Sequence, residues 1–172
     1  MEYEIRQWIK ERLSTNLPEF NNLPACPFAK EALIKNKIVI QELDNQYESR
    51  MSMKEYFLAE LENYSYHWPK GKEVIVLGCK PELISSDDLS DIVEIASDKF
   101  LTKRGFIALE DHPAVEEKVL EYKLNQGSYA LILLQEAEKL QKAREILKKK
   151  QYYKNWTKDY LNDVVQSFPH TS

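Results

Sequence analysis

Glycine and cysteine are scarce in this chain of 172 residues, which has four glycines and two cysteines. The glycine-rich motifs GxGxxG and GxxxxGK[ST], which hold phosphate groups through backbone N–H groups, do not occur. The motifs GxSxG and HExxH are missing as well. These absences argue against the common nucleotide-dependent enzymes, serine hydrolases and zinc proteases. Two cysteines also cannot form an all-cysteine zinc site, and we expect both to be free thiols.

Long apolar segments are lacking too. The longest uninterrupted run, Ala130 to Leu134, is far shorter than the roughly 20 residues of a membrane-spanning helix. The first ten residues contain two glutamates before any apolar run, whereas a signal peptide has a basic start followed by an apolar block. We therefore predict a cytoplasmic protein without a membrane segment. Its net charge of −4 gives no overall attraction to nucleic acid.

Helical and strand-like patterns alternate along the chain. Ile5, Trp8 and Leu13 recur at helical spacing, and Ser52 with Glu55 has the spacing of a capping box. Helices are predicted at residues 2–13, 28–35, 52–66, 85–103, 114–124, 136–150 and 156–168, and strands at 37–44, 73–78, 106–110 and 128–135. This order predicts an α/β fold with helices packed on a small sheet of about four strands. A ferredoxin-like α+β sandwich is the alternative. We expect one domain, 1–172, with a charged, aromatic helical region from about residue 136.

Reactive side chains follow two of the predicted strands. Cys79 ends the second strand, and Glu110, Asp111 and His112 end the third. Ligands bind at the carboxyl ends of the strands in an open parallel sheet, so a parallel arrangement would bring these residues to one edge. They also have ordinary structural interpretations. A cysteine at the end of a strand can be a small buried residue, and Asp111 before Pro113 can be a helix N-cap.

A second cysteine lies in the stretch Pro24-Ala25-Cys26-Pro27, directly before a predicted helix. A helix start and a nearby cation such as Lys30 lower the pKa of a thiol, although the prolines could simply fix a buried loop. One hypothesis is a small-molecule enzyme in which Cys26 or Cys79 is a thiolate, His112 is an acid/base and Asp111 orients it. Another is a zinc or iron site in which His112 and Glu110 join a cysteine.

Trp8 in the first predicted helix and the later stretch Cys26-Pro27-Phe28-Ala29-Lys30 resemble the N-terminal signature of an uncharacterised bacterial domain family. In that family a tryptophan-bearing helix precedes a Leu-Cys-Pro-Phe-Ala motif. The resemblance covers residues 1–30, and here Pro24-Ala25 precedes the cysteine in place of leucine. The family has no established activity to carry over. The resemblance therefore nominates Cys26 as a site residue and implies nothing more.

The C-terminal region interleaves basic and aromatic residues, including Lys148–Lys150, Tyr152, Tyr153 and Trp156. Such a pattern can hold single-stranded nucleic acid, but no RRM, KH or zinc-finger motif accompanies it and the net charge is negative. Tyrosine, tryptophan and arginine are also enriched in protein interfaces. The alternative to an enzyme is thus a non-catalytic interaction module that uses the C-terminal helices. The expected partner is a small molecule or another protein.

Overall fold

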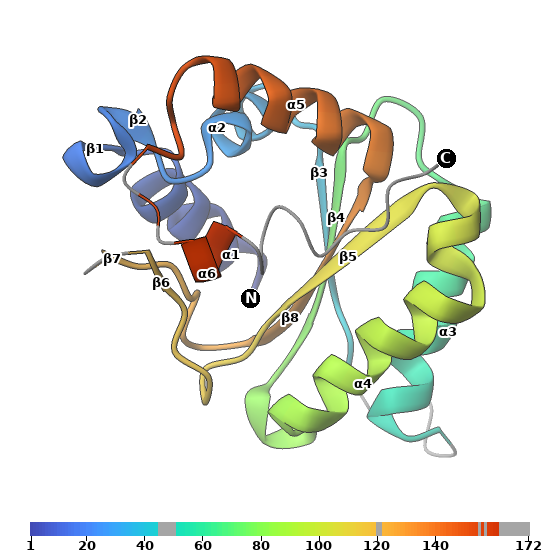
Figure 1. Cartoon of the computed structure of the whole chain (residues 1–172). Helices are drawn as coiled ribbons and strands as arrows, with labels where there is room; N and C mark the ends of the chain where they lie inside the picture. The colour runs from blue at the N-terminus through green and yellow to red at the C-terminus, as the bar shows by residue number, and fades with distance from the viewer. Residues whose placement is uncertain (45–50, 120–121, 155, 157, 162–172) are drawn as a thin grey trace.

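A mixed four-stranded sheet forms the centre of the molecule in this computed structural model (Figure 1). The structure describes residues 1–44, 51–119, 122–154, 156 and 158–161. The strands are β3 (Ile38–Glu42), β4 (Val74–Cys79), β8 (Ala130–Glu136) and β5 (Phe106–Asp111), in that spatial order. Strands β3 and β4 are parallel, whereas β8 is antiparallel to both of its neighbours, β4 and β5. Strands β3, β4 and β5 therefore all run in the same direction.

Helices and short ribbons surround this sheet. The helices are α1 (Glu2–Trp8), α2 (Pro27–Ile34), α3 (Met53–Tyr66), α4 (Ser86–Ala96), α5 (Ala137–Lys149) and α6 (Lys158–Leu161). Shorter turns are the π-helical η1 (Ile9–Leu13) and η4 (Ser97–Leu101) and the 3-10 segments η2 (Pro18–Phe20), η3 (Pro81–Leu83) and η5 (Thr102–Arg104). Two-residue strands pair as β1 (Asn16–Leu17) with β2 (Leu23–Pro24) and β6 (Lys118–Val119) with β7 (Tyr122–Lys123). None of the helices in the described part of the chain has the length and apolar composition needed to cross a membrane.

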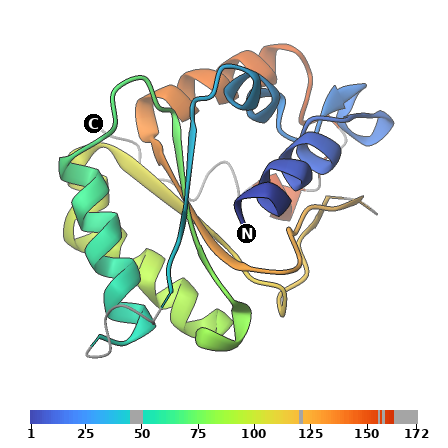
Figure 2. The same cartoon turned by 180° about the vertical axis from the view of Figure 1, so that it is seen from behind.

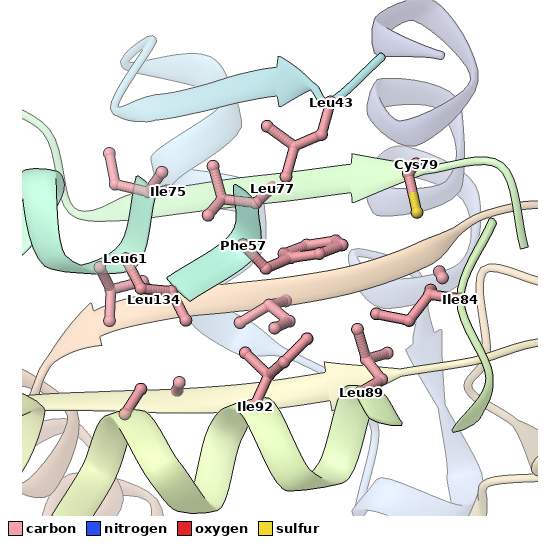
Figure 3. Packing of buried hydrophobic residues seen from close by; sticks show 14 of the residues in the cluster. Leu43, Phe57, Leu61, Ile75, Leu77, Cys79, Ile84, Leu89, Ile92 and Leu134 are labelled. Carbon is pink, nitrogen blue, oxygen red and sulfur yellow. The ribbon is translucent and has the colours of Figure 1, made fainter. Parts of the chain in front are cut away.

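Helices α3 and α4 cover one face of the sheet and enclose the larger core (Figure 3). Helix α3 begins with the predicted capping box, in which the Ser52 side chain accepts from the Glu55 N–H and Glu55 accepts from the Ser52 N–H. Its apolar stripe, which includes Phe57 and Leu61, packs on the sheet at helical spacing. Ser85 caps α4 by accepting from the Asp88 N–H at 3.1 Å.

Helices α1 and α2 cover the opposite face, as the view from behind shows (Figure 2). Ile5 and Ile9 pack there on Val76 and Leu131 of the sheet. A side chain at Gly78 would crowd this contact, because a Cβ atom there would lie 2.6 Å from a Leu131 methyl carbon. Helices on both faces of a sheet that includes a parallel pair confirm the α/β prediction. The ferredoxin-like alternative, an antiparallel sandwich, does not describe this sheet.

The helix predicted at 114–124 is wrong, because the described residues of that segment form turns and the ribbon β6–β7. Asn125 accepts from the Glu117 N–H at 2.7 Å, and the Leu124 carbonyl accepts from the Trp8 indole at 2.9 Å. These long-range bonds hold the segment extended and override its local helical pattern. Asp111 is accordingly no helix N-cap. Of the predicted helix at 156–168, only α6 and Trp156 are described, and residues 157 and 162–168 lie outside the described residues.

Candidate functional site

The predicted strand-end site is only partly assembled. Strands β4 and β5 end at the same edge, as a common direction requires, but β8 lies between them. Cys79 pairs with Ala130 and Asp111 pairs with Leu131 on the two sides of β8. Since neighbouring strands lie about 4.8 Å apart, the backbones of β4 and β5 are about 10 Å apart. The edge therefore holds both residues. Because β4 and β5 are not adjacent, however, strand pairing does not bring the Cys79 thiol into contact with the His112 imidazole.

Cys79 is a core residue, with its side chain among Phe57, Ile84 and Leu89 (Figure 3). It is fully buried. Burial raises the pKa of the Cys79 thiol to about 12, and the negative charge of Glu82 adds to this effect. The thiol is therefore protonated at neutral pH and out of reach of a substrate. It packs as a small hydrophobic residue.

His112 uses both ring nitrogens within the fold. Its Nδ1 atom accepts a hydrogen bond from the Ala114 N–H at 3.1 Å, which assigns the proton to Nε2. Nε2 then donates to the Ile84 carbonyl, also at 3.1 Å. His112 as a whole is 8% exposed. With one nitrogen accepting and the other donating, the imidazole has no position left for a substrate proton or a metal ion.

Asp111 binds the segment that leads into β8 and does not orient His112. Its Oδ1 atom accepts from the Asn125 side-chain amide and its Oδ2 atom accepts from the Gln126 N–H, both at 2.8 Å. The same Asn125 amide donates to the Val115 carbonyl at 2.8 Å. The buried carboxylate thus holds together the loops at both ends of the β6–β7 ribbon. Its observed role is structural.

The predicted metal site is not formed among the described residues, where no group of three or more histidine, cysteine, aspartate or glutamate side chains could hold an ion. Glu110 accepts a hydrogen bond from Ser90 of α4 at 3.0 Å. Neighbouring residues of a strand point to opposite faces, so Asp111 is directed away from Glu110. His112 has both nitrogens engaged, as described above. The donor atoms named for zinc or iron therefore do not converge.

Glu117 has an unusual pKa, which no pattern in the sequence indicates. Burial raises the pKa of Glu117 to about 7, and the negative charges of Asp111 and Glu110 raise it further. Its backbone N–H donates to Asn125 at the base of the ribbon. The sequence held no signal for this, because a segment predicted as a helix does not show that Glu117 lies near Asp111 and Glu110. With a pKa of about 7, the Glu117 carboxyl is partly protonated near neutral pH.

Cys26 and Glu110 are the partly exposed residues of the predicted site, whereas Cys79, Asp111 and His112 are buried. Cys26 forms the N-cap of α2, and its own N–H donates to the Leu13 carbonyl at 2.8 Å. Burial nevertheless raises the pKa of its thiol. The N–H groups of Ala29 and Phe28 favour the thiolate and oppose that effect in part, although the side chain makes no capping hydrogen bond. The thiol is therefore not activated in this structure.

The C-terminal aromatic residues pack beside the loop that carries Cys26. Tyr152 is 2% exposed, stacks on Phe20 with ring centroids 5.6 Å apart, and donates its hydroxyl hydrogen to the Ala25 carbonyl. Trp156 lies edge-on to Tyr153 at 4.9 Å. Two motifs that are far apart in the sequence thus meet in one cluster. Its aromatic faces are used mainly for this internal contact.

A surface groove lies between α3 and the helical segment that continues α4. Apolar side chains form its floor, acidic side chains border it on α3, and basic side chains border it on η4 and η5. Glu62 and Arg104, on opposite sides, lie 3.9 Å apart as an ion pair. The residues of this groove, hereafter the α3–η4 groove, are Glu55, Leu58, Ala59, Glu62, Ile95, Lys99, Phe100 and Arg104. The sequence indicates only one side of this groove, because Glu55, Leu58, Ala59 and Glu62 follow the i, i+3, i+4, i+7 spacing of one helix face.

Comparison of the chain with family models, curated proteins and solved structures gives no match. The arrangement of the side chains is therefore the basis for assigning a function.

Proposed function

We propose that the protein is a non-catalytic protein-binding module and that the α3–η4 groove is its binding surface. The observation that carries this proposal is an apolar floor at the surface between walls of opposite charge. Leu58 and Ile95 remain partly exposed, and Ala59 is exposed. An apolar floor with a charged rim is the usual composition of a transient protein interface.

The condition of the predicted catalytic residues supports a binding function over an enzymatic one. An acid/base or nucleophilic residue must reach a substrate atom within hydrogen-bond distance. Cys79 is enclosed in the core, and the polar atoms of Asp111 and His112 are bound to neighbouring loops. Each of these side chains stabilises the fold in its present position.

The groove is also a better candidate surface than the C-terminal helices. Tyr152 is buried against Phe20, and Tyr153 and Trp156 are partly covered within the same cluster. A partner that used these rings would have to displace their internal contacts. The floor of the α3–η4 groove needs no such rearrangement.

Site-specific photo-crosslinking in an extract of the source cells tests this function. A photo-reactive amino acid is placed at Ala59 or Lys99 in the groove, and at Lys149 on α5 as the control, an exposed position far from the groove. We expect both groove positions to label the same segment of one protein and the Lys149 position not to label it. Labelling that is absent, or equal at all three positions, would show that the groove is not a binding surface.

A second candidate is a small-molecule enzyme with Cys26 as its thiol. The observation in its favour is the electrostatic environment of Tyr153. Burial raises the pKa of Tyr153, Arg144 lowers it, and Cys26 raises it. A cation, a phenol and a thiol therefore influence one another at this point. Burial of the thiol argues against a resting thiolate.

Alkylation of Cys26 as a function of pH, in a Cys79→Ser background, separates the two candidates. The raised pKa predicts a midpoint above the ordinary thiol value of about 8.5. A midpoint well below that value would identify an activated thiolate and would place the enzyme ahead of the binding module.

A further inference from the structure

We infer that the partner occupies the α3–η4 groove as an amphipathic helix, with cationic side chains along α3 and anionic side chains along η4. This inference rests on the proposed function and specifies the chemistry of the partner. It follows from the length of the groove, the way its walls are fixed, the hydrogen-bonding state of their backbones and the distribution of charge.

The groove has the length of about two helical turns. Its α3 wall extends from Glu55 to Glu62. At 1.5 Å per residue these positions are about 10 Å apart along the helix axis. A partner helix would therefore contact the floor through an apolar stripe of the form i, i+3 or i+4, i+7.

Polar contacts fix the two walls relative to each other on either side of the groove. Lys54 of α3 donates to Asp91 of α4 at 2.8 Å and lies 3.4 Å from Asp88. At the other end of α3, Arg104 donates to Ser65 at 2.6 Å and lies 3.9 Å from Glu62. The Arg104 guanidinium also lies 3.5 Å from the centre of the Tyr66 ring. The groove is therefore preformed, which lowers the entropic cost of binding.

The backbones of the walls favour a helix over an extended peptide. An extended peptide needs backbone partners, which in known complexes come from an exposed sheet edge. Here both walls are helical, so their N–H and C=O groups are largely bonded within the helices. A bound helix satisfies its own backbone and can lie on Leu58, Ala59 and Ile95 without leaving N–H groups unpaired. The small Ala59 side chain allows a close approach.

The charges of the walls set the polar flanks of the partner. Hydrogen bonds from Ser52 lower the pKa of Glu55, so this carboxylate stays ionised at neutral pH. On the opposite wall, Lys99 is exposed and forms no salt bridge with any residue that the structure describes. A helix with lysine or arginine on one flank and aspartate or glutamate on the other complements both walls. Such rim charges mainly affect the association rate and the choice of partner.

Synthetic helical peptides test this inference directly. Three stapled peptides share one leucine stripe and differ on their flanks, which carry lysine and glutamate on opposite sides, lysine on both, or glutamate on both. Each is titrated into the full-length protein at low salt. We expect the mixed-flank peptide to bind at least about tenfold more tightly than either single-sign peptide, a difference of about 1.4 kcal/mol.

Variants of the protein locate the binding. Ala59→Arg should abolish binding of the mixed-flank peptide, whereas Ala114→Arg, at an exposed position outside the groove, should not change it. Lys99→Glu should weaken binding of the mixed-flank peptide and strengthen binding of the peptide with lysine on both flanks. Exchanging the two flanks of the mixed peptide should reverse its direction in the groove, which an N-terminal nitroxide reports by NMR relaxation.

Equal binding of the three peptides, no binding at all, or binding that Ala59→Arg leaves intact would overturn the helix inference. If photo-crosslinking at Ala59 and Lys99 still identifies a partner in that case, the binding function stands and its partner uses another structure. If the mixed peptide binds as expected but no cellular protein is labelled, the proposed function fails and the chemistry of the groove is confirmed.

Discussion

The sheet edge at the ends of β4 and β5 differs from the α3–η4 groove in how many of its polar atoms already form hydrogen bonds within the fold. At the edge, Asp111 and His112 are the residue types that enzymes employ, yet their polar atoms bind neighbouring loops. In the groove, Lys99 is an exposed surface residue that forms no salt bridge within the described part of the chain, and it lies beside a partly exposed apolar floor. A side chain is available for function only if some of its bonding capacity remains, so the less reactive set is the better functional candidate.

Among the substitutions that test this comparison, removal of the Asp111 carboxylate should cause the largest loss of stability. Asp111→Ala removes the acceptor of the Gln126 N–H and one of the two acceptors of the buried Asn125 amide. We expect the free energy of unfolding to fall by about 4 kcal/mol, measured by urea denaturation. Asp98→Ala, at an exposed position of η4, is the control and should change stability by less than about 0.5 kcal/mol. A small effect of Asp111→Ala would mean that the edge is not structural.

Glu117 should make the stability of the edge depend on pH. Its pKa is about 7 in the folded protein and 4.5 for an ordinary glutamate. Between these values the folded state holds a proton that the unfolded state has lost, so stability falls as pH rises from 4.5 to 7. Glu117→Gln removes this penalty and should raise the free energy of unfolding by about 3 kcal/mol at pH 8, with little change at pH 4.

Urea denaturation at several pH values measures this effect, and Glu116→Gln, an exposed neighbour, is the control. An equal gain at pH 4 and pH 8 would show that Glu117 is not the group that titrates.

The two cysteines should respond differently to replacement by serine. Cys79→Ser places a hydroxyl in the apolar core and should cost about 2 kcal/mol. Cys26→Ser introduces a favoured N-cap residue at the start of α2 and should change stability by less than about 0.5 kcal/mol. Thermal denaturation of the two variants provides the measurement. A similar loss for both would mean that Cys26 is as enclosed as Cys79.

A substitution in the groove should have the smallest effect on stability. Ala59 is exposed, so Ala59→Arg should change the free energy of unfolding by less than about 0.5 kcal/mol while it blocks the floor. Leu61→Ala, two residues away and fully buried, should instead cost about 3 kcal/mol. Urea denaturation of both variants distinguishes the two faces of α3. A large loss for Ala59→Arg would mean that the groove is part of the core.

The layered α/β fold was predictable because its signals are local. Apolar periodicity located α3 and α4, and the Ser52–Glu55 pair marked the start of α3. The β6–β7 ribbon was not predictable, because its conformation depends on hydrogen bonds with residues outside the segment. These residues are Trp8, which is distant in the sequence, and Asn125, which follows the segment directly. The same holds for the direction of β8, since a strand pattern contains no information about its neighbours.

The candidate site was predictable only in part. The sequence identified residue types with chemical potential, such as His112 and Cys79, but burial and hydrogen-bond partners determine whether they can act. Those partners, including the Ile84 carbonyl, are backbone groups that no motif reports. The α3–η4 groove combines two helix faces that become neighbours only in the folded structure. A single helix pattern therefore could not indicate it.

The central position of β8 also constrains how the chain acquires its structure. Strand β8 is the last strand of the sheet in sequence, yet it separates β4 from β5. Until the ribosome has released residues 130–136, β5 has no partner and one edge of β4 is open. Exposed strand edges promote aggregation, and pairing over such distances is slow. Nascent chains that lack β8 should therefore depend on chaperones, and C-terminal truncation before residue 136 should yield insoluble protein.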